Sequence, residues 1–85
     1  MLQNLQEPIQ VAGVFTQGKF TPRAFQWRSQ AYHIAQVTAS HNWKDGQVRK
    51  RHYAVTVKEP RAAQLYVLEF WRDQESWYLH QVWVV

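Results

Sequence analysis

The chain contains no cysteine and only three glycines and three prolines among its 85 residues. The absence of cysteine excludes disulfide bonds and thiolate metal ligands, and it is typical of proteins kept in a reducing cytoplasm. No apolar run approaches the roughly 20 residues that a membrane helix requires. The first residues, MLQNLQEP, also lack the basic start and apolar stretch of a signal peptide. These absences predict a cytoplasmic protein without membrane contact.

Motifs for catalysis are missing as well. The four histidines, His33, His41, His52 and His80, do not show the short spacings of zinc-binding motifs. The few carboxylates form no obvious pair of convergent acids, and Glu69 is expected to be a cross-strand or arginine partner. No serine lies in a nucleophile elbow, and three scattered glycines provide no phosphate-binding loop. The sequence therefore predicts a protein that is not an enzyme and that holds no cofactor or metal.

Aromatic side chains are abundant, with five Trp, four Tyr and four Phe. A domain of this size buries only about 60% of the surface of its unfolded chain. Each ring can bury roughly 150–250 Å², so these side chains can supply much of a small core. We expect a single β domain over residues 8–85, preceded by a flexible N-terminus at residues 1–7.

The pattern of apolar and turn residues predicts an all-β fold. Strands are expected at residues 9–15, 23–27, 31–41 and 48–58, followed by a hairpin built from 65–71 and 77–85. Gly13 should mark a bend or bulge in the first strand, and a bulge near Ala35 or Gln36 should restore the register of the third. Glu59-Pro60-Arg61 should end the fourth strand. About six antiparallel strands would thus form a small barrel or a strongly curled sheet.

The fourth strand should have one apolar and one polar side. Tyr53, Val55 and Val57 are expected to face the core. The opposite face would be wet and basic, with Lys50, His52, Thr56 and Lys58.

The register of the closing hairpin depends on its loop. A three-residue loop at 74–76 would place Glu69 opposite Gln81, whereas a four-residue loop would place it opposite His80. We favour the first. Both faces of this hairpin carry aromatic residues, which suggests that some rings remain exposed.

The whole net charge of +4 arises in one segment. Between Lys44 and Lys58, five basic residues face a single acidic one, and the rest of the chain is balanced. Cations neutralise phosphates while aromatic rings stack on unpaired bases, so this segment predicts contact with single-stranded nucleic acid. The alternative is a solvated hairpin whose charges keep the sheet edge from pairing. The candidate nucleic-acid-binding residues are Trp43, Lys44, Arg49, Lys50, Arg51 and His52.

A second group combines indole rings with guanidinium groups. Arginine stacks on tryptophan in ordinary packing, which is the favoured interpretation, but an exposed cluster would indicate a protein partner. A small-ligand site in the mouth of a barrel is a third alternative. The candidate interaction surface consists of Trp27, Arg28, Trp71 and Arg72, with Arg23 nearby.

Seven short segments together give the chain a familiar pattern. In order they are Pro8-Ile-Gln-Val, Ala24-Phe-Gln-Trp-Arg28, Tyr32-His-Ile with Val37, Trp43, Arg51-His-Tyr53, Leu68-Glu-Phe-Trp-Arg-Asp73, and Trp77-Tyr-Leu with Val82-Trp83. From Pro8 onward the chain resembles a bacterial domain family of unknown function, encoded beside or fused to Y-family-polymerase-like DNA-damage-tolerance proteins. The resemblance implies an all-β fold and a role near DNA repair or replication, with nucleic acid or a repair protein as partner. The chain departs from the family pattern where Ser29-Gln30 and Glu75-Ser76 replace turns that contain glycine.

Overall fold

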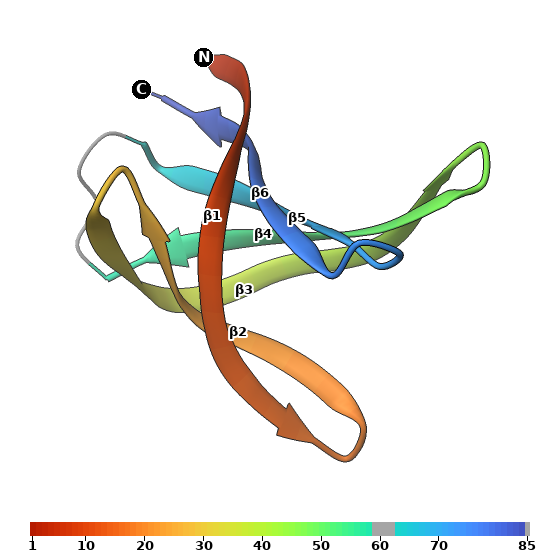
Figure 1. The fold of residues 1–85 in the computed structure, drawn as a ribbon. Helices are drawn as coiled ribbons and strands as arrows, with labels where there is room; N and C mark the ends of the chain where they lie inside the picture. The colour runs from red at the N-terminus through yellow and green to blue at the C-terminus, as the bar shows by residue number, and fades with distance from the viewer. Residues whose placement is uncertain (59–62, 85) are drawn as a thin grey trace.

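Six antiparallel strands form a closed ring, in which β1 pairs with β6 and every other pairing joins sequence neighbours (Figure 1). The computed structural model describes residues 1–58 and 63–84, without the side chain of Asp45. These residues contain no helix that is long and apolar enough to cross a membrane. The predicted all-β fold, a strongly curled sheet of about six antiparallel strands, is confirmed. The strands are β1 (Leu2–Thr16), β2 (Lys19–Trp27), β3 (Gln30–Asp45), β4 (Val48–Val57), β5 (Leu65–Trp71) and β6 (Ser76–Trp83).

The first strand begins earlier than its sequence pattern indicates. Residues 1–7 were expected to precede the β domain as a flexible segment, but Leu2 already pairs with Trp83 of β6. Leu5 packs against the core. Backbone hydrogen bonds to a neighbouring strand form whatever the side chains are. This part of the strand has no alternation of apolar and polar residues, so the sequence pattern could not identify it.

Two predicted bulges are confirmed. The β1–β2 register shifts between Ala12 and Gly13, and the β3–β4 register shifts between Ile34 and Gln36. A Cβ atom on Gly13 would lie 2.3 Å from the carbonyl oxygen of Thr21, so the close approach of the two strands requires glycine.

The third strand is longer than predicted. It continues past His41 to Asp45, and only Gly46 and Gln47 form the turn to β4. Gly46 has a φ of 62°, which suits a two-residue hairpin turn. The predicted break at Glu59-Pro60-Arg61 lies outside the described residues.

Neither predicted register of the β5–β6 hairpin is correct. The loop occupies residues 72–75, Trp71 pairs with Ser76, and Glu69 therefore lies opposite Tyr78. Further along, Leu68 pairs with Leu79 but Val67 pairs with Gln81, which leaves His80 as a bulge residue. Sequence alternation could not reveal a bulge that changes the register within the strand.

The core lies on the inner side of the curled sheet. Here Phe25 stacks on Tyr32 at a ring separation of 5.0 Å and an interplanar angle of 7°, and Tyr66 packs against both rings. The predicted apolar side of β4 is confirmed, because Tyr53, Val55 and Val57 are all buried. The bulge at His80 lets two residues three positions apart, Leu79 and Val82, both enter this core. The buried apolar residues are Phe25, Trp27, Tyr32, Ile34, Tyr53, Val55, Val57, Ala63, Tyr66, Leu68, Leu79 and Val82.

Candidate functional site

The β3–β4 hairpin extends beyond the ring as an arm (Figure 1). We call residues 42–51 the basic arm. Side chains alternate between the two sides of a strand, so the cross-strand pair Lys44 and Arg49 lies on the same side as Arg51 and the core residue Tyr53. Trp43 and its partner Lys50 lie on the other side. The predicted nucleic-acid-binding residues are thus divided between two sides of the arm.

Three cations lie on the inner side of the basic arm. Arg51 donates to the side-chain oxygens of Asn42 and Ser40, each at 2.9 Å, and its guanidinium carbon lies 5.4 Å from the ring centre of Tyr53. Arg49 forms an exposed ion pair with Asp73 at 3.4 Å. Exposed pairs of this kind contribute about 0–1 kcal/mol, so a phosphate can replace Asp73 at little cost. A hollow of about 200 Å³ at the arm is lined by residues from both of its sides and from the β5–β6 loop, namely Asn42, Trp43, Lys44, Arg49, Lys50 and Arg72.

On the other side of the arm, Lys50 lies between two indoles. Its ammonium group is 4.9 Å from the ring centre of Trp43 and 4.3 Å from that of Trp71. Trp43 keeps 42% of its surface exposed. Lys50 therefore holds both rings by cation–π contacts and is less available to phosphate than Lys44 or Arg49.

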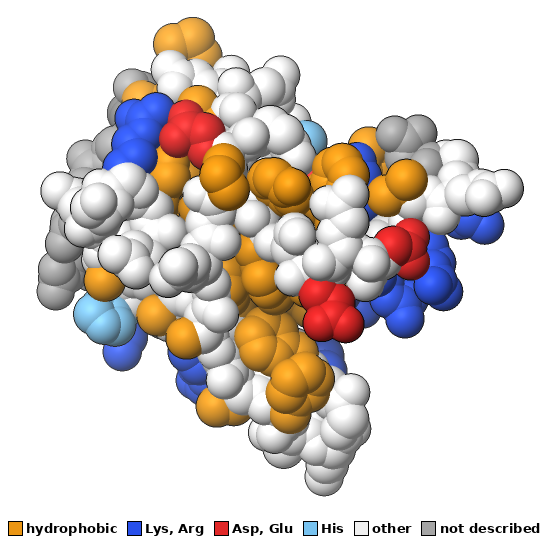
Figure 2. Space-filling view, in the orientation of Figure 1, with side chains coloured by type: hydrophobic (Ala, Val, Ile, Leu, Met, Phe, Trp, Pro, Cys, Tyr) orange, Lys and Arg blue, Asp and Glu red, His pale blue; other side chains and the backbone are white. Residues whose placement is uncertain are grey.

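Next to the basic arm, rings from five strands make a continuous series, which we call the aromatic row. Phe15 is 77% exposed and lies 5.1 Å from Phe20, which lies 5.7 Å from Trp77. Trp77 in turn lies 5.6 Å from Tyr53 and 4.8 Å from Phe70. Figure 2 shows hydrophobic side chains as a band on the β1–β2 hairpin and Lys and Arg gathered along the β3–β4 hairpin. Because Tyr53 contacts Arg51, the row ends at the cations of the basic arm.

The sequence did not reveal the aromatic row. Phe15, Phe20 and Trp77 come from three different strands, and only the closure of the ring brings β6 beside β1. The position of Phe15 next to a turn was the one feature of the sequence that could have indicated an exposed ring.

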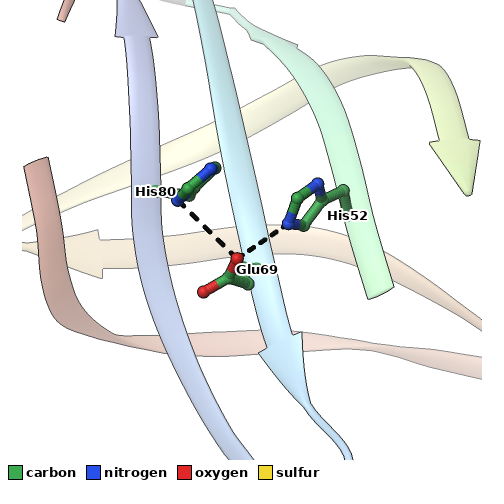
Figure 3. Close-up of side chains that lie close together, drawn as sticks. All are labelled: His52, Glu69 and His80. Carbon is green, nitrogen blue, oxygen red and sulfur yellow. Dashed lines mark hydrogen bonds and ion pairs between the residues drawn. The ribbon is translucent and has the colours of Figure 1, made fainter. Parts of the chain in front are cut away.

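A polar cluster lies on the outer side of β4, β5 and β6. Glu69 is 0% exposed, and one carboxylate oxygen, Oε2, lies 2.7 Å from Nε2 of His52 and 3.6 Å from Nδ1 of His80 (Figure 3). The other oxygen, Oε1, accepts hydrogen bonds from the Gln6 amide at 2.7 Å and from the Trp71 indole. Glu69 is thus a cross-strand partner of His52, as predicted, although no described contact joins it to an arginine. We call His52, Glu69 and His80 the His–Glu cluster.

The placement of His52 corrects the predicted wet face of β4. His52 is buried, and its ring stacks on His80 at 4.9 Å and contacts Trp43 at 5.2 Å. Its imidazole is engaged by Glu69 rather than free to meet phosphate. Strand alternation correctly placed His52 outward, but the large neighbouring side chains cover it there.

The environment of the cluster shifts two pKa values. Burial raises the pKa of Glu69, but hydrogen bonds from Gln6, Trp71 and His52 outweigh it and hold the pKa below its ordinary value. Burial lowers the pKa of His80, although the Glu69 carboxylate opposes this effect. Glu69 is therefore ionised at neutral pH, and the imidazole of His80 favours its neutral form.

The predicted interaction surface is not one exposed patch. Trp27 is 7% exposed, and its indole donates to Glu7 at 2.9 Å. Arg28 lies over this ring at 4.6 Å and pairs with Glu7 at 2.8 Å, which holds the pKa of Glu7 below its ordinary value. Trp71 and Arg72 lie at the end of β5, which is not a neighbour of β2 in the ring. The favoured interpretation of Arg28 as a packing partner of tryptophan agrees with this geometry.

The fold and site define a small all-β protein with a closed ring of strands, a projecting basic arm and an aromatic row that is exposed at Phe15 and buried at Tyr53. Comparisons with protein-family models, curated proteins and solved structures found no match to this chain. The resemblance to the family associated with DNA-damage tolerance stays a prediction.

Proposed function

We propose that this domain binds single-stranded nucleic acid along the aromatic row and the inner side of the basic arm. In this role it acts as a noncatalytic accessory module in DNA repair or replication, and the resemblance supports that setting. The observation that carries the proposal is the continuity of the row, which begins at the exposed ring of Phe15, passes through the half-buried rings of Phe20 and Trp77 and reaches the arm at buried Tyr53, 5.4 Å from the guanidinium carbon of Arg51. Proteins that bind single strands combine accessible rings, on which bases stack, with cations along the backbone.

Salt dependence tests the electrostatic part of the proposal. Three phosphate contacts, by Lys44, Arg49 and Arg51, give a slope of log affinity against log salt of about −2 for a single strand. We expect the double variant Lys44→Gln with Arg49→Gln to reduce the slope by about 1.4, because two contacts are lost. Fluorescence anisotropy of a labelled oligothymidylate, measured from 50 to 200 mM salt, provides the slopes. Both side chains are exposed, so the variant should stay folded.

The matched control removes two other exposed cations. Arg23→Ala with Lys58→Ala causes the same change in net charge, but Arg23 lies on β2 and Lys58 follows the end of β4 opposite the arm. We expect this variant to keep the slope of the original protein. No binding at 50 mM salt, or an equal loss in both double variants, would contradict the proposal.

Two other functions receive less support from the geometry. A protein-interaction module using Trp27, Arg28, Trp71 and Arg72 would need both indoles on one exposed patch, and Trp27 is buried. A small-ligand site would need a pocket of at least about 300 Å³. One hollow of about 300 Å³ reaches this size, but it lies on the outer surface, where four of its lining residues, Pro8, Gln10, Gln26 and Ser29, are exposed. The hollow lined by Leu5, Trp27, Ala63 and Val82, among others, has about 240 Å³.

A further inference from the structure

The His–Glu cluster has the composition and geometry of a metal site. One ligand atom from each of His52, Glu69 and His80 lies within 4.8 Å of the other two. In a tetrahedral zinc shell, bond lengths near 2.1 Å place neighbouring ligand atoms roughly 3.3 Å apart. The distances of 2.7 and 3.6 Å from Oε2 of Glu69 to the two imidazoles bracket this value. A movement of each imidazole nitrogen by less than 1 Å relative to Oε2 of Glu69 would bring both distances to the value expected for neighbouring zinc ligands.

The surroundings of Glu69 orient a single oxygen toward the two rings. Both N–H donors outside the cluster, Gln6 and Trp71, bind Oε1, so Oε2 is the atom left facing His52 and His80 (Figure 3). The oxygen of the same Gln6 amide accepts a hydrogen bond from His80 at 2.7 Å. Donors that bind the second oxygen of a carboxylate ligand fix its orientation in known metal sites, and Gln6 and Trp71 act on Glu69 in this way. The bond from His80 to Gln6 uses Nδ1, the atom that faces Glu69, so this bond must break when a metal ion binds.

Two irregularities of the sheet meet at this place. The β1–β6 register shifts between Asn4 and Glu7, and the β5–β6 register shifts at His80. Gln6 in the first bulge has a φ of 54°, in the left-handed region that residues other than glycine seldom adopt. Bulges redirect side chains beside functional sites, and a strained backbone persists where the surrounding structure requires it. The two bulges direct Gln6 and His80 to Glu69.

We propose that His52, Glu69 and His80 bind one divalent transition-metal ion, of the zinc class, on the outer side of the sheet. Two imidazoles and one carboxylate form a ligand set suited to Zn²⁺ or Co²⁺, and water or a further group completes the coordination. His80 is the most exposed of the three, so the ion enters at its ring. Binding requires lone pairs on Nε2 of His52 and on Nδ1 of His80. The protons that these atoms donate to Glu69 and to the Gln6 oxygen therefore move to the other nitrogen of each ring or to solvent. The site is independent of the nucleic-acid proposal.

Titration of the untagged protein with Zn²⁺ tests the site, using calorimetry for stoichiometry and affinity. We expect one ion per chain and a loss of affinity of at least tenfold in His80→Ala. The control is His33→Ala, which removes an exposed histidine on β3 and should keep the affinity of the original protein. Equal affinity in His80→Ala and the original protein, or an equal loss in the His33→Ala control, would overturn the assignment.

A second measurement needs no variant. Zn²⁺ added to the original protein should shift the imidazole NMR signals of His52 and His80 at one equivalent and leave those of His33 in place. Co²⁺ should give the visible absorption of a four- or five-coordinate ion at the same stoichiometry. Absence of any shift at one equivalent of Zn²⁺ would overturn the proposal even if the variants fail to fold.

Discussion

Replacement of Glu69 by leucine is expected to destabilise the domain by about 3–5 kcal/mol, which is the usual cost of removing one partner from a buried charged network. The substitution removes the acceptor of three hydrogen bonds, from Gln6, Trp71 and His52, at a position that is 0% exposed. Of these donors His52 is buried and would stay without its partner, whereas Gln6 and Trp71 are at least partly exposed. Because small domains have a net stability of only about 5–15 kcal/mol, this loss is a large fraction of the total. Urea denaturation followed by tryptophan fluorescence measures it.

Glu7 provides the matched control for this substitution. It also accepts hydrogen bonds from an indole and a cation, Trp27 and Arg28, but one third of its side chain is exposed. Water can replace the lost partners, so Glu7→Gln should cost less than about 1 kcal/mol. Similar losses for Glu69→Leu and Glu7→Gln would show that the outer cluster is not a buried network.

The second large effect is expected in the inner core. Phe25→Ala should lower the free energy of unfolding by about 3–5 kcal/mol, because it removes a fully packed ring. Phe25 is 2% exposed, stacks on Tyr32 at 5.0 Å and touches Tyr66 at 5.5 Å. The cavity would lie between β2, β3 and β5, where none of the neighbouring rings can rotate without losing its own contacts. Urea denaturation is again the measurement.

Phe15→Ala makes the same chemical change at the tip of the β1–β2 hairpin. Phe15 is 77% exposed, so its removal should alter stability by no more than about 0.5 kcal/mol. The same variant should weaken binding of a single strand if bases stack on Phe15. A loss of stability in Phe15→Ala equal to that in Phe25→Ala would contradict the arrangement of the core.

Much of the fold could be predicted because the strands carry clear local signals. The alternation of Tyr53, Val55 and Val57 identified the inner side of β4, and Gly13 identified a bulge. The same alternation puts Arg49 and Arg51 on the side of Tyr53. What failed was the register of the last hairpin, because its loop lies at residues 72–75 rather than at 74–76. Beyond Leu79 the bulge at His80, which has no signature in composition, changes the register once more.

The candidate sites were harder to predict because they depend on pairing between distant segments. The basic arm was visible as a run of charge, but the ring contacts that extend it to Phe15 require β1 and β6 to be neighbours. The His–Glu cluster joins residues 17 and 11 positions apart on three strands, so motif spacing gives no sign of it. Antiparallel register, not sequence distance, decides which of these side chains meet.

The proposed binding of a single strand along the aromatic row and the basic arm can be tested directly. The five indole N–H groups report on it separately in a ¹H–¹⁵N correlation spectrum recorded during titration with an oligothymidylate of about ten nucleotides. We expect the Trp77 signal to shift, because this ring lies at the centre of the row. The Trp27 and Trp83 signals should stay in place, since Trp27 is buried beside Glu7 and Trp83 lies at the far end of β6. A saturating titration that leaves Trp77 unmoved, or that shifts Trp27 and Trp83 instead, would contradict the claim.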